Sequence, residues 1–585
     1  SLFLITLSLM GCEEEEIIEA KITPQTETSV IFSSNETVTT KTFSFSSTKP
    51  WQLEAFNETW LDVTPKEGKE GNALLTIQLK ELETTENRSV EIKIVSENAT
   101  AQFSVTQEKN KEPVIELTGV EIINPPTALK IGDKVKLEFA IQPENATINE
   151  VMWESSDAGI ISVGEEGNIE ALAEGSATIT VNVNDKTADC LINSSYPDNI
   201  LTFKKLSKDD YYPVAFEDNE YIVSDNFKIE AGATLLMEDN ITVKIMNNVE
   251  ITVEGMIDFT PETGATVMGY DADSHPKSIY LTGEGSGGNF ENITFIDVPI
   301  RLFASNNPVI INNCEFKDIG SNRAALDLGN SFSLTVTNSK FIQNVYPAIT
   351  GAANYAVPLV FKNNHLDNNS LTARNRPQIN VTVGGDGLVE IADNTIIGPK
   401  EITTNGGIAV SNLMGHKGTN KVKISGNDVR YCRYGITTNG VMNVEISKNE
   451  LVDNKYEVNP MNGGSGISIY NTNGGQKVVI SENIIKEHFW GITIIGNVAG
   501  NIGPEVNVGN LNEGDDYNIG KNIFDDNGNN DALYDLFNNS PIDVSAVNNN
   551  WGVAEQTEEE IEKVISHKND DLSLGRVTFM PPYKP

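Results

Sequence analysis

Between Phe290 and Trp551 a short pattern of apolar and polar positions recurs along the chain. Each copy has an apolar residue, two small or polar residues, usually an Asn, then any residue and a second apolar residue. Copies begin at Phe290, Ile311, Val336, Phe361, Ile391, Ile424, Ile446, Ile480 and Ile519. Repeats of this length indicate a solenoid or a propeller. The apolar runs are short, β-rich and bounded by Asn or Gly, so the pattern predicts coils of strands rather than pairs of helices.

Two markers keep the same register from copy to copy. Asn occupies the fourth position in six of them: Asn364, Asn394, Asn427, Asn449, Asn483 and Asn522. Strands stacked about 4.8 Å apart would bring these amides into a hydrogen-bonded ladder. A Gly-Ile pair opens an alternating strand at Gly407, Gly435, Gly466 and Gly491. Each coil therefore has at least two strands. Its variable length is expected in one turn, because loops tolerate insertions better than stacked strands do.

Together these markers resemble the right-handed parallel β-helix repeat proteins of the pectate-lyase-like superfamily. The resemblance covers roughly residues 200–585 and implies a right-handed, single-stranded parallel β-helix over residues 198–585. The open strand edges at its ends need caps. Residues 201–216 are expected to supply the first cap, and the helical pattern of residues 558–565 the second. The superfamily includes lyases, hydrolases, esterases, adhesins and tailspikes, so the resemblance does not fix an activity.

Apolar and polar residues also alternate in residues 21–109 and 110–197, which predicts two small β-sandwiches and an all-β chain. Residues 21–109 resemble the BACON domain. The resemblance is carried by Trp51, residues 60–65, Gly68, Gly71, residues 87–88 and residues 105–107. It implies a frequent link to glycan or mucin binding, for which Trp51 and Trp60 would be the sugar platform. In so small a sandwich at least one Trp is expected in the core, and the spacer role is favoured.

Residues 110–197 resemble the group 2 bacterial Ig-like domain. The resemblance is carried by residues 151–157, 161–163, 167–169 and 175–181. Trp153 lies in an alternating strand and is expected to be the core Trp of this sandwich. The resemblance implies a stalk rather than a catalytic module.

The first residues have the composition of an export signal. Residues 1–11 are apolar, uncharged and too short to span a bilayer, as in the hydrophobic part of a truncated signal peptide. Residues 9–12 resemble a bacterial lipobox, which implies lipidation of Cys12 and anchoring in a membrane. The acidic residues 13–16, within a tether of residues 12–20, resemble the surface-export signal of Bacteroidetes lipoproteins. The alternative is an ordinary solvated tether. The expected location is the outer membrane, facing the cell exterior.

Charge and cysteine usage exclude several classes of function. The formal net charge of −41 argues against binding nucleic acid or an anionic surface through bulk charge. Cys190, Cys314 and Cys432 are far apart and lack metal-ligand spacing, so neither a disulfide nor a zinc site is expected. No cofactor is expected. Ca²⁺ at residues 515–516 or 525–526 is left open, although solvated charge is favoured there.

Candidate chemistry concentrates in the variable turns. No familiar catalytic motif is present in the sequence, but cations and aromatics gather in these turns. Aromatic faces stack on sugar rings, and Arg binds carboxylate or sulfate bidentately. The predicted substrate-binding residues are Tyr434, Trp490, Arg374, Arg376 and Tyr456. Tyr434 and Trp490 each precede a Gly-Ile pair, which predicts equivalent places two coils apart. The alternative is structural, with aromatics covering the flank and cations pairing with the abundant acids.

An enzymatic interpretation is β-elimination at a uronate. A cation neutralises the substrate carboxylate, and a base removes the neighbouring proton. The candidates are Arg430 or Arg433 as the neutralising group and Lys486, His488 or Tyr434 as the base. The sequence thus predicts a surface lipoprotein that binds extracellular polysaccharide. The alternatives are a lyase or glycosidase acting on an acidic glycan, and a structural display or adhesion protein.

Overall fold

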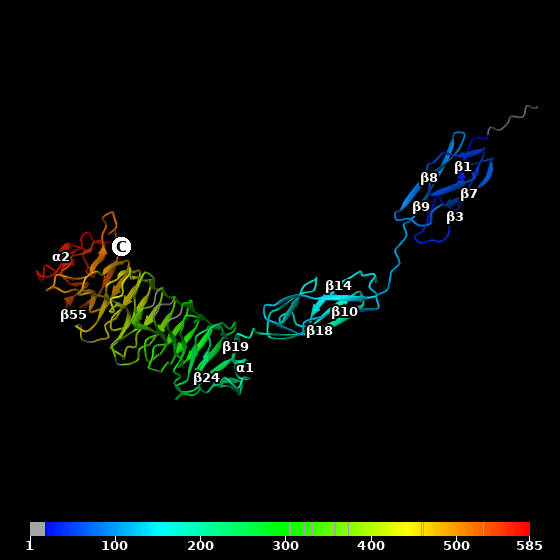
Figure 1. The fold of residues 1–585 in the computed structure, drawn as a ribbon. Helices are drawn as coiled ribbons and strands as arrows, with labels where there is room; N and C mark the ends of the chain where they lie inside the picture. Colours follow the sequence, from blue (N-terminus) through cyan, green and yellow to red (C-terminus); the bar gives the residue numbers. More distant parts are fainter. Residues whose placement is uncertain are drawn as a thin grey trace, which may run out of the picture. The chain divides into compact units, whose positions relative to one another are not determined.

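The computed structural model describes residues 18–303, 306–320, 322–329, 333–355, 358–372, 374–457, 459, 461–530 and 532–584. The chain divides into two compact units, Ser1–Ser194 and Ser195–Pro585 (Figure 1). Almost every regular element is a strand. The predicted signal segment and Cys12 lie outside the described residues.

The first sandwich packs two sheets around an aromatic core. One sheet has the order β1 (Ile22–Pro24), β3 (Thr40–Ser47), β7 (Gly71–Leu79) and β5 (Leu61–Thr64). The other has the order β2 (Ser29–Phe32), β9 (Ala99–Gln107), β8 (Arg88–Ser96), β4 (Trp51–Leu53) and β6 (Glu67–Gly68). The rings of Phe43 and Phe103 stack between the sheets with centroids 4.0 Å apart. Trp51 and Trp60 are both only 4% exposed, so neither offers a face to a sugar.

The second sandwich is built from three smaller sheets. One sheet has the order β11 (Ala128–Lys130), β18 (Lys186–Ser195), β17 (Gly175–Val183) and β14 (Val151–Ser155). A second has the order β12 (Lys134–Lys136), β16 (Asn168–Ala171) and β15 (Ile161–Val163). The third is the pair β10 (Gly119–Ile123) and β13 (Glu138–Gln142). Ile179, Val181 and Ile192 fill the core. Trp153 is half-buried at the core margin, where its ring meets Phe139 edge-on with centroids 6.0 Å apart.

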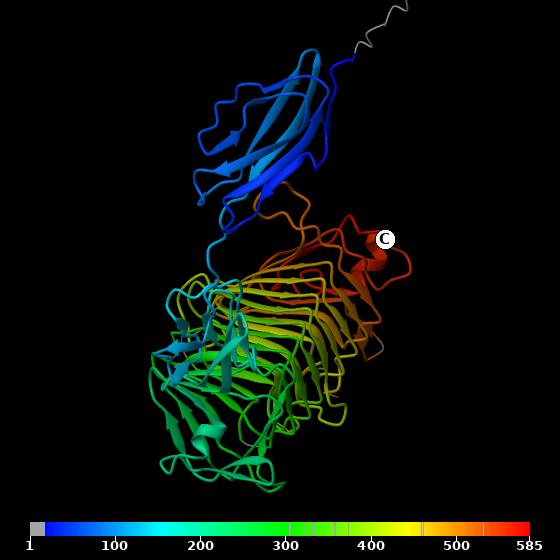
Figure 2. The ribbon, with the colours of Figure 1, turned by 90° about the vertical axis from the view of Figure 1, so that its right-hand side faces the viewer.

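Three long sheets of parallel strands build the second unit (Figures 1 and 2). Sheet 1 has 13 strands, from β22 (Phe227–Ile229) to β59 (Ile565–Ser566). Sheet 2 has 14 strands, from β19 (Ile200–Thr202) to β60 (Val577–Thr578). Sheet 3 has 13 strands, from β20 (Val214–Glu217) to β54 (Ile523–Asp525). The chain runs through sheet 2, sheet 3 and sheet 1 in turn, so from β21 to β54 strand n pairs with strand n+3. The prediction of an all-β chain with two sandwiches and a parallel β-helix is confirmed.

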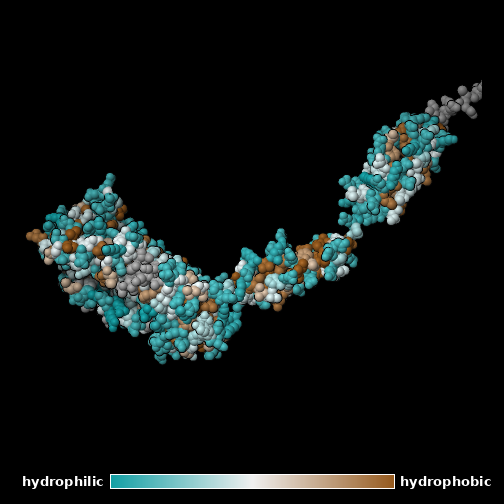
Figure 3. All heavy atoms as spheres, viewed as in Figure 1, coloured by the Kyte–Doolittle hydropathy of each residue, from teal (hydrophilic) through white to brown (hydrophobic). Residues whose placement is uncertain are grey.

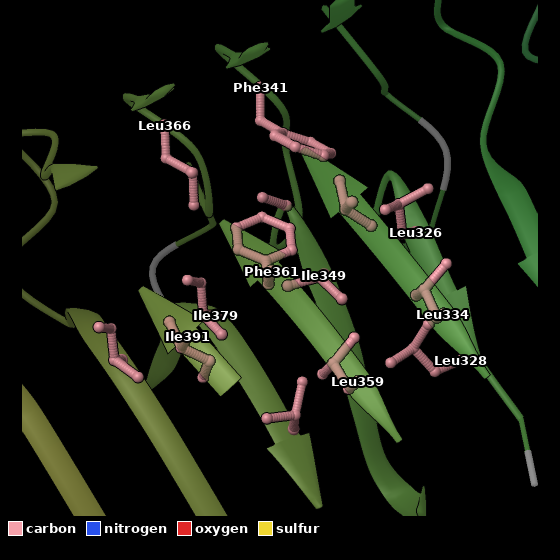
Figure 4. Packing of buried hydrophobic residues seen from close by; sticks show 14 of the residues in the cluster. Leu326, Leu328, Leu334, Phe341, Ile349, Leu359, Phe361, Leu366, Ile379 and Ile391 are labelled. Atoms are coloured by element: carbon pink, nitrogen blue, oxygen red, sulfur yellow. The ribbon is translucent and has the colours of Figure 1, made fainter. Parts of the chain in front are cut away.

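Inward-facing aliphatic and aromatic side chains fill the β-helix. Leu326, Leu334, Ile349, Leu359 and Ile379, from neighbouring strands of sheets 1 and 2, meet in its interior (Figure 4). The rings of Phe295, Phe316 and Phe341 stack with centroids 4.8 and 5.0 Å apart. Such stacking follows from the alternation along each strand, because equivalent positions of parallel strands repeat at the strand spacing. The outer surface is largely hydrophilic in the view of Figure 3.

The predicted Asn ladder is present at the turn between sheets 2 and 3. Asn364, Asn394, Asn427, Asn449, Asn483, Asn522 and Asn549 are each at most 2% exposed. Each amide Nδ2 donates to the Oδ1 of the next, at 2.8–3.1 Å. The same Oδ1 accepts the backbone N–H of the preceding Asn. The ladder therefore satisfies polar groups that the tight turn would otherwise leave buried without partners.

Short elements cover both ends of the β-helix. At the start, α1 (Phe203–Leu206) buries Phe203 and Leu206, and β20 pairs antiparallel with β21 (Glu220–Val223). At the end, α2 (Glu558–Glu562) buries Ile561, and β60 returns to pair in parallel with β58 (Val544–Ala546). The antiparallel strand and the two short helices close edges that would otherwise be open to pairing with other chains.

Candidate functional site

A groove of about 280 Å³ crosses the outer face of sheet 1 near the end of the β-helix. Its floor comes from β46 (Ile436–Gly440), β49 (Ser465–Tyr470), β52 (Trp490–Ile495) and β57 (Leu536–Asn539), which are consecutive in the sheet. The lining residues are Asn375, Arg433, Tyr434, Thr437, Met461, Asn462, Gly463, Ser465, Ser468, Trp490, Thr493, Ile495, Phe537 and Asn539. Three of the sequence-predicted residues, Arg433, Tyr434 and Trp490, therefore share one groove.

The two aromatics hold equivalent positions of alternate coils. Ile436 pairs with Ile467, and Ser465 pairs with Trp490, which sets Tyr434 and Trp490 two strand spacings apart, about 9.6 Å along the axis. Tyr434 lies over Gly406, where a Cβ would overlap its ring. Trp490 stacks on Phe537 with centroids 5.2 Å apart and contacts Tyr534 at 4.8 Å. The packing of both rings against fixed neighbours makes a rigid apolar strip.

Polar groups border this strip and interrupt it, because the register places Ser465 between Tyr434 and Trp490. The Arg433 Nε donates to the carbonyl oxygen of Asn462 at 2.7 Å, and a second guanidinium nitrogen also donates to that oxygen. Ser465 Oγ and Thr493 Oγ1 lie 2.9 Å apart. None of the described residues that line the groove is Asp or Glu. In a chain with a net charge of −41, the groove is therefore a locally cationic surface.

The hypothesis that Arg430 shares this groove is wrong. Arg430 ends β45 (Asp428–Arg430) on sheet 3, while Arg433 lies in the turn that leads to sheet 1. The Arg430 guanidinium pairs with Asp428 at 2.6 Å and Glu450 at 2.8 Å. Lys486 ends the equivalent strand β51 (Ile484–Lys486) and pairs with Asp525 at 3.5 Å. Both cations thus lie outside the groove and are engaged with acids.

The hypothesis of His488 as an accessible base is also wrong. Its ring is fully buried, with Nε2 3.2 Å from Asn454 Nδ2 and Nδ1 3.1 Å from Asn527 Oδ1. The two Asn amides are oriented by backbone partners, so the ring is a neutral Nδ1–H imidazole in a chain of hydrogen bonds. Burial lowers the pKa of His488 to about 3. Burial likewise raises the pKa of Tyr434, which opposes its service as a phenolate base.

His488 belongs to a second buried ladder that the sequence did not reveal. This ladder lies at the turn between sheets 3 and 1 and includes Asn344, Asn369, Asn454, Asn527 and Asp535. Asp535 accepts from Asn527 Nδ2 at 3.1 Å and from the Gly552 N–H at 2.7 Å. Burial raises its pKa to about 7. The signal was an Asn two residues after four of the sheet-3 strands, but other residues occupy this position in the coils of Ile319, Pro399, Cys432 and His488.

The remaining predicted binding residues lie outside the groove lining. Arg376, at the start of β40 (Arg376–Thr382), stacks over Tyr346 at 4.6 Å. Arg374 is exposed in the preceding turn. Tyr456 contacts Tyr431 edge-on at 5.9 Å, and Lys400 lies 3.7 Å over the Tyr431 ring. These contacts form separate cation–aromatic clusters on the same flank.

Among the described residues, no group of three or more His, Cys, Asp or Glu side chains is placed to hold a metal ion. Asp525 is the partner of Lys486, and Asp515 and Asp516 lie in a surface loop. Cys190, Cys314 and Cys432 are buried free thiols, and burial raises the pKa of Cys314 and Cys432 to about 12. No helix in the described part of the chain has the length and apolar character to cross a membrane.

Comparison with known families concerns the first unit. Residues 20–110 match the viral BACON domain, and residues 116–191 match the group 2 bacterial Ig-like domain. The N-terminal part of the chain is a BACON domain followed by a bacterial Ig-like domain. Domains of these two kinds fit a surface or carbohydrate-related protein.

Similar proteins cover only short stretches. Two uncharacterized proteins of Clostridium acetobutylicum are 41% identical over 68 residues and 34% identical over 80 residues, or 12% and 13% of this chain. The chain covers 17% and 8% of their lengths. Domains 4 and 5 of the S-layer protein SbsC match with 17% identity over 22% of this chain and 86% of that chain, at a TM-score of 0.13. A Bacteroides ovatus GH5 xyloglucanase in complex with a XXXG heptasaccharide matches with 16% identity over 16% and 20%, at a TM-score of 0.14. Likeness at this level does not bear on function.

Proposed function

We propose that this protein binds an acidic extracellular polysaccharide, without catalysis, in the groove formed by Arg433, Tyr434 and Trp490. The observation that carries the proposal is the in-register pair of aromatic rings on one rigid strip beside an arginine. Pyranose rings present apolar faces that stack on Tyr and Trp, and two rings on alternate coils suit successive sugars of one chain. Thr437, Ser468 and Thr493 offer hydroxyls along the same floor for sugar hydroxyls.

The charge of the groove supports an acidic glycan. Arg433 has one cationic edge held by the Asn462 carbonyl, which fixes the guanidinium plane for contact with a carboxylate or sulfate. The described lining offers no carboxylate that would repel such a group. Binding of an anionic chain is therefore favoured locally although the protein as a whole is strongly acidic.

The lyase alternative has weaker support from the same geometry. β-Elimination needs a cation and a base that reach the same sugar. Arg430 and Lys486 lie on sheet 3, His488 is buried, and the raised pKa of Tyr434 keeps its phenol protonated. Of the five candidates only Arg433 and Tyr434 line the groove, which supplies a carboxylate contact but no ready base.

Replacing Trp490 by Ala is expected to weaken binding of a uronate-containing oligosaccharide at least about tenfold, because one stacked sugar face loses its partner. Arg433→Gln is expected to reduce affinity for acidic but not neutral glycans. Titration calorimetry against alginate, pectin, heparin and chondroitin fragments measures both effects. Tyr270→Ala, an aromatic 39% exposed outside the groove, is the matched control.

The same mixtures distinguish binding from catalysis. A lyase would release an unsaturated product that absorbs in the ultraviolet, whereas a binding protein leaves the absorbance unchanged. Unaltered affinity of the Trp490→Ala variant, with a folded β-helix by circular dichroism, would place the glycan elsewhere. Absence of binding to every acidic glycan would leave the structural display role.

We also propose that the chain is anchored to the outer membrane through lipid on Cys12 and faces the cell exterior. The support is the sequence of residues 9–16, with small and apolar residues before the Cys and acidic residues after it. Expressed with its native leader, the Cys12→Ser variant is expected to lose incorporation of labelled fatty acid and to leave the membrane fraction. Replacement of residues 13–16 by Ser tests surface exposure separately, through protease access to intact cells.

A further inference from the structure

A second groove, of about 760 Å³, lies on sheet 2, on a different face from the candidate glycan site. Its floor is the outer face of β44 (Lys421–Ser425), β47 (Asn443–Ser447), β50 (Lys477–Ser481) and β53 (Glu505–Gly509), four consecutive strands of that sheet. Nothing in the proposed glycan binding uses this surface.

The register of the paired strands determines the order of the charges on this floor. Lys421, Asn443, Lys477 and Glu505 form one row across the strands, and Lys423, Glu445, Val479 and Asn507 form the next. One end of the groove, at β44, therefore presents two lysines. Three strand spacings away, about 14 Å, β53 presents Glu505.

A projecting loop extends the acidic end. Residues 510–518 leave and rejoin the surface through an antiparallel bridge between Asn510 and Asn518. The Asn507 side chain donates to the Asp516 carbonyl oxygen at 2.8 Å and so fixes the loop beside β53. Asp515, Asp516 and Tyr517, which is 53% exposed, come from this loop and line the groove.

Four of the charges at the two ends have no ion-pair partner within the described part of the chain. Glu505, on the last strand of the floor, pairs with Lys477 at 3.3 Å, but no ion pair within 4.0 Å involves Lys421, Lys423, Asp515 or Asp516 among the described residues. Between the two ends lie Asn443, Glu445, Lys477 and Val479, of which Val479 is apolar and 38% exposed. The surface thus combines a cationic end, a mixed centre and an anionic end.

We infer that this groove is a self-association surface, and that its occupant is a second copy of the chain. A two-fold axis in the interface, parallel to the strands and between β47 and β50, places the β44 lysines of each copy against the acidic loop of the other. An interface of this symmetry uses the same patch twice, so each contact between unlike charges occurs twice. Strands β47 and β50 of the two copies then meet at the axis, and the β-helices run antiparallel.

The overall charge sets the conditions for this association. A net charge of −41 on each copy opposes approach, but its long-range part is screened beyond a Debye length of about 8 Å at physiological ionic strength. Contacts between a lysine and a carboxylate act at shorter distances and survive this screening. The dimer is therefore expected to be weak and reversible, to dissociate on dilution, and to depend on the four end residues.

A charge-exchange experiment tests the inference. Sedimentation velocity of the protein, at physiological salt and increasing concentration, is expected to show a monomer–dimer equilibrium. Lys421→Glu with Lys423→Glu, and separately Asp515→Lys with Asp516→Lys, are each expected to weaken self-association at least about tenfold by placing like charges together. An equimolar mixture of the two variants is expected to associate again, because each reversed end then meets an opposite charge in the other variant.

Recovery in the mixture shows that the opposite charges of the two ends meet between copies, and a largest species of dimer size distinguishes the two-fold arrangement from head-to-tail chains. A wild-type protein that stays monomeric up to its highest soluble concentration overturns the inference. The inference is also overturned if the mixture stays as monomeric as each variant alone, or if both variants still form the dimer. Because none of the four residues lines the sheet 1 groove, glycan affinity is expected to be unchanged in these variants. Failure of the glycan proposal is thereby distinguishable from failure of this one.

Discussion

Replacing Asn449 by Ala is expected to destabilise the β-helix by about 3 kcal/mol, because the side chain is a rung of a buried polar ladder. Asn449 Oδ1 accepts the backbone N–H and the side-chain N–H of Asn427, at 3.0 and 2.9 Å. Its Nδ2 donates to Ile424 O, Ser447 O and Asn483 Oδ1 at 2.9–3.1 Å. Alanine removes the amide and leaves its hydrogen-bond partners buried without a donor or acceptor. The substitution supplies no other polar group in its place.

The loss is measured as a lower midpoint of urea unfolding, followed by circular dichroism. Because stacked repeats can unfold in segments, faster exchange of the Asn427 amide hydrogen gives a local second readout. Asn473→Ala is the control, since that side chain is exposed at a turn of the same unit. Equal stability of the two variants would show that the ladder contributes nothing beyond an ordinary surface amide.

Acid sensitivity from His488 is expected to be the second large effect. In the folded protein burial lowers the pKa of His488 to about 3, while in the unfolded chain its pKa is near the usual 6.5. Between these values only the unfolded chain takes up the proton. Stability is therefore complete above pH 6.5 and is lost as the pH falls toward 3, by an amount of the order of 4 kcal/mol.

The variant His488→Asn is expected to lose this dependence, because Asn occupies the rungs before and after it, at Asn454 and Asn527. Asp535 acts in the opposite direction. Its pKa is raised to about 7, so the folded state keeps a proton that the unfolded chain has released, and stability falls as the pH rises from about 4 to 7. Urea midpoints at several pH values should thus fall with rising pH in His488→Asn. An unchanged pH slope relative to the parent protein would contradict the assignment.

The parts of the fold that depend on repetition could be predicted from the sequence. Asn427, Asn449 and Asn483 recur at one position of one pattern, and identical side chains in stacked strands have only one way to satisfy their amides. The second ladder was not predicted because its rungs change in chemistry, with Cys432 and His488 standing where other coils have Asn. From the sequence alone His488 is a catalytic candidate, and its structural role becomes clear only from its contacts with Asn454 and Asn527.

The candidate site could be predicted only in part. Tyr434 and Trp490 were placed correctly because both precede a Gly-Ile pair, which fixes their register. Arg430 and Arg433 are three residues apart, but the strand end between them sends one to sheet 3 and the other into the groove. In the first sandwich, Trp51 packs against Gly68 and Phe45 in the core. Because Trp51 stands at a strand end, the alternation of apolar and polar residues alone does not show whether its side chain faces the core or the solvent.

The direction of the Asn ladder gives the β-helix a polarity. Every Nδ2 from Asn364 to Asn522 donates toward the carboxyl end, and Asn549 closes the series. Each coil thus depends on its successor for an acceptor. Deleting coils from the carboxyl end uncovers the side-chain and backbone N–H of the new last Asn and a carbonyl oxygen beside it. Deletion from the amino end uncovers the Oδ1 of the new first Asn and the second N–H of its Nδ2, which had donated to a carbonyl oxygen of the preceding coil. The two ends of a shortened solenoid therefore present different groups to solvent, with one more donor exposed at the carboxyl end.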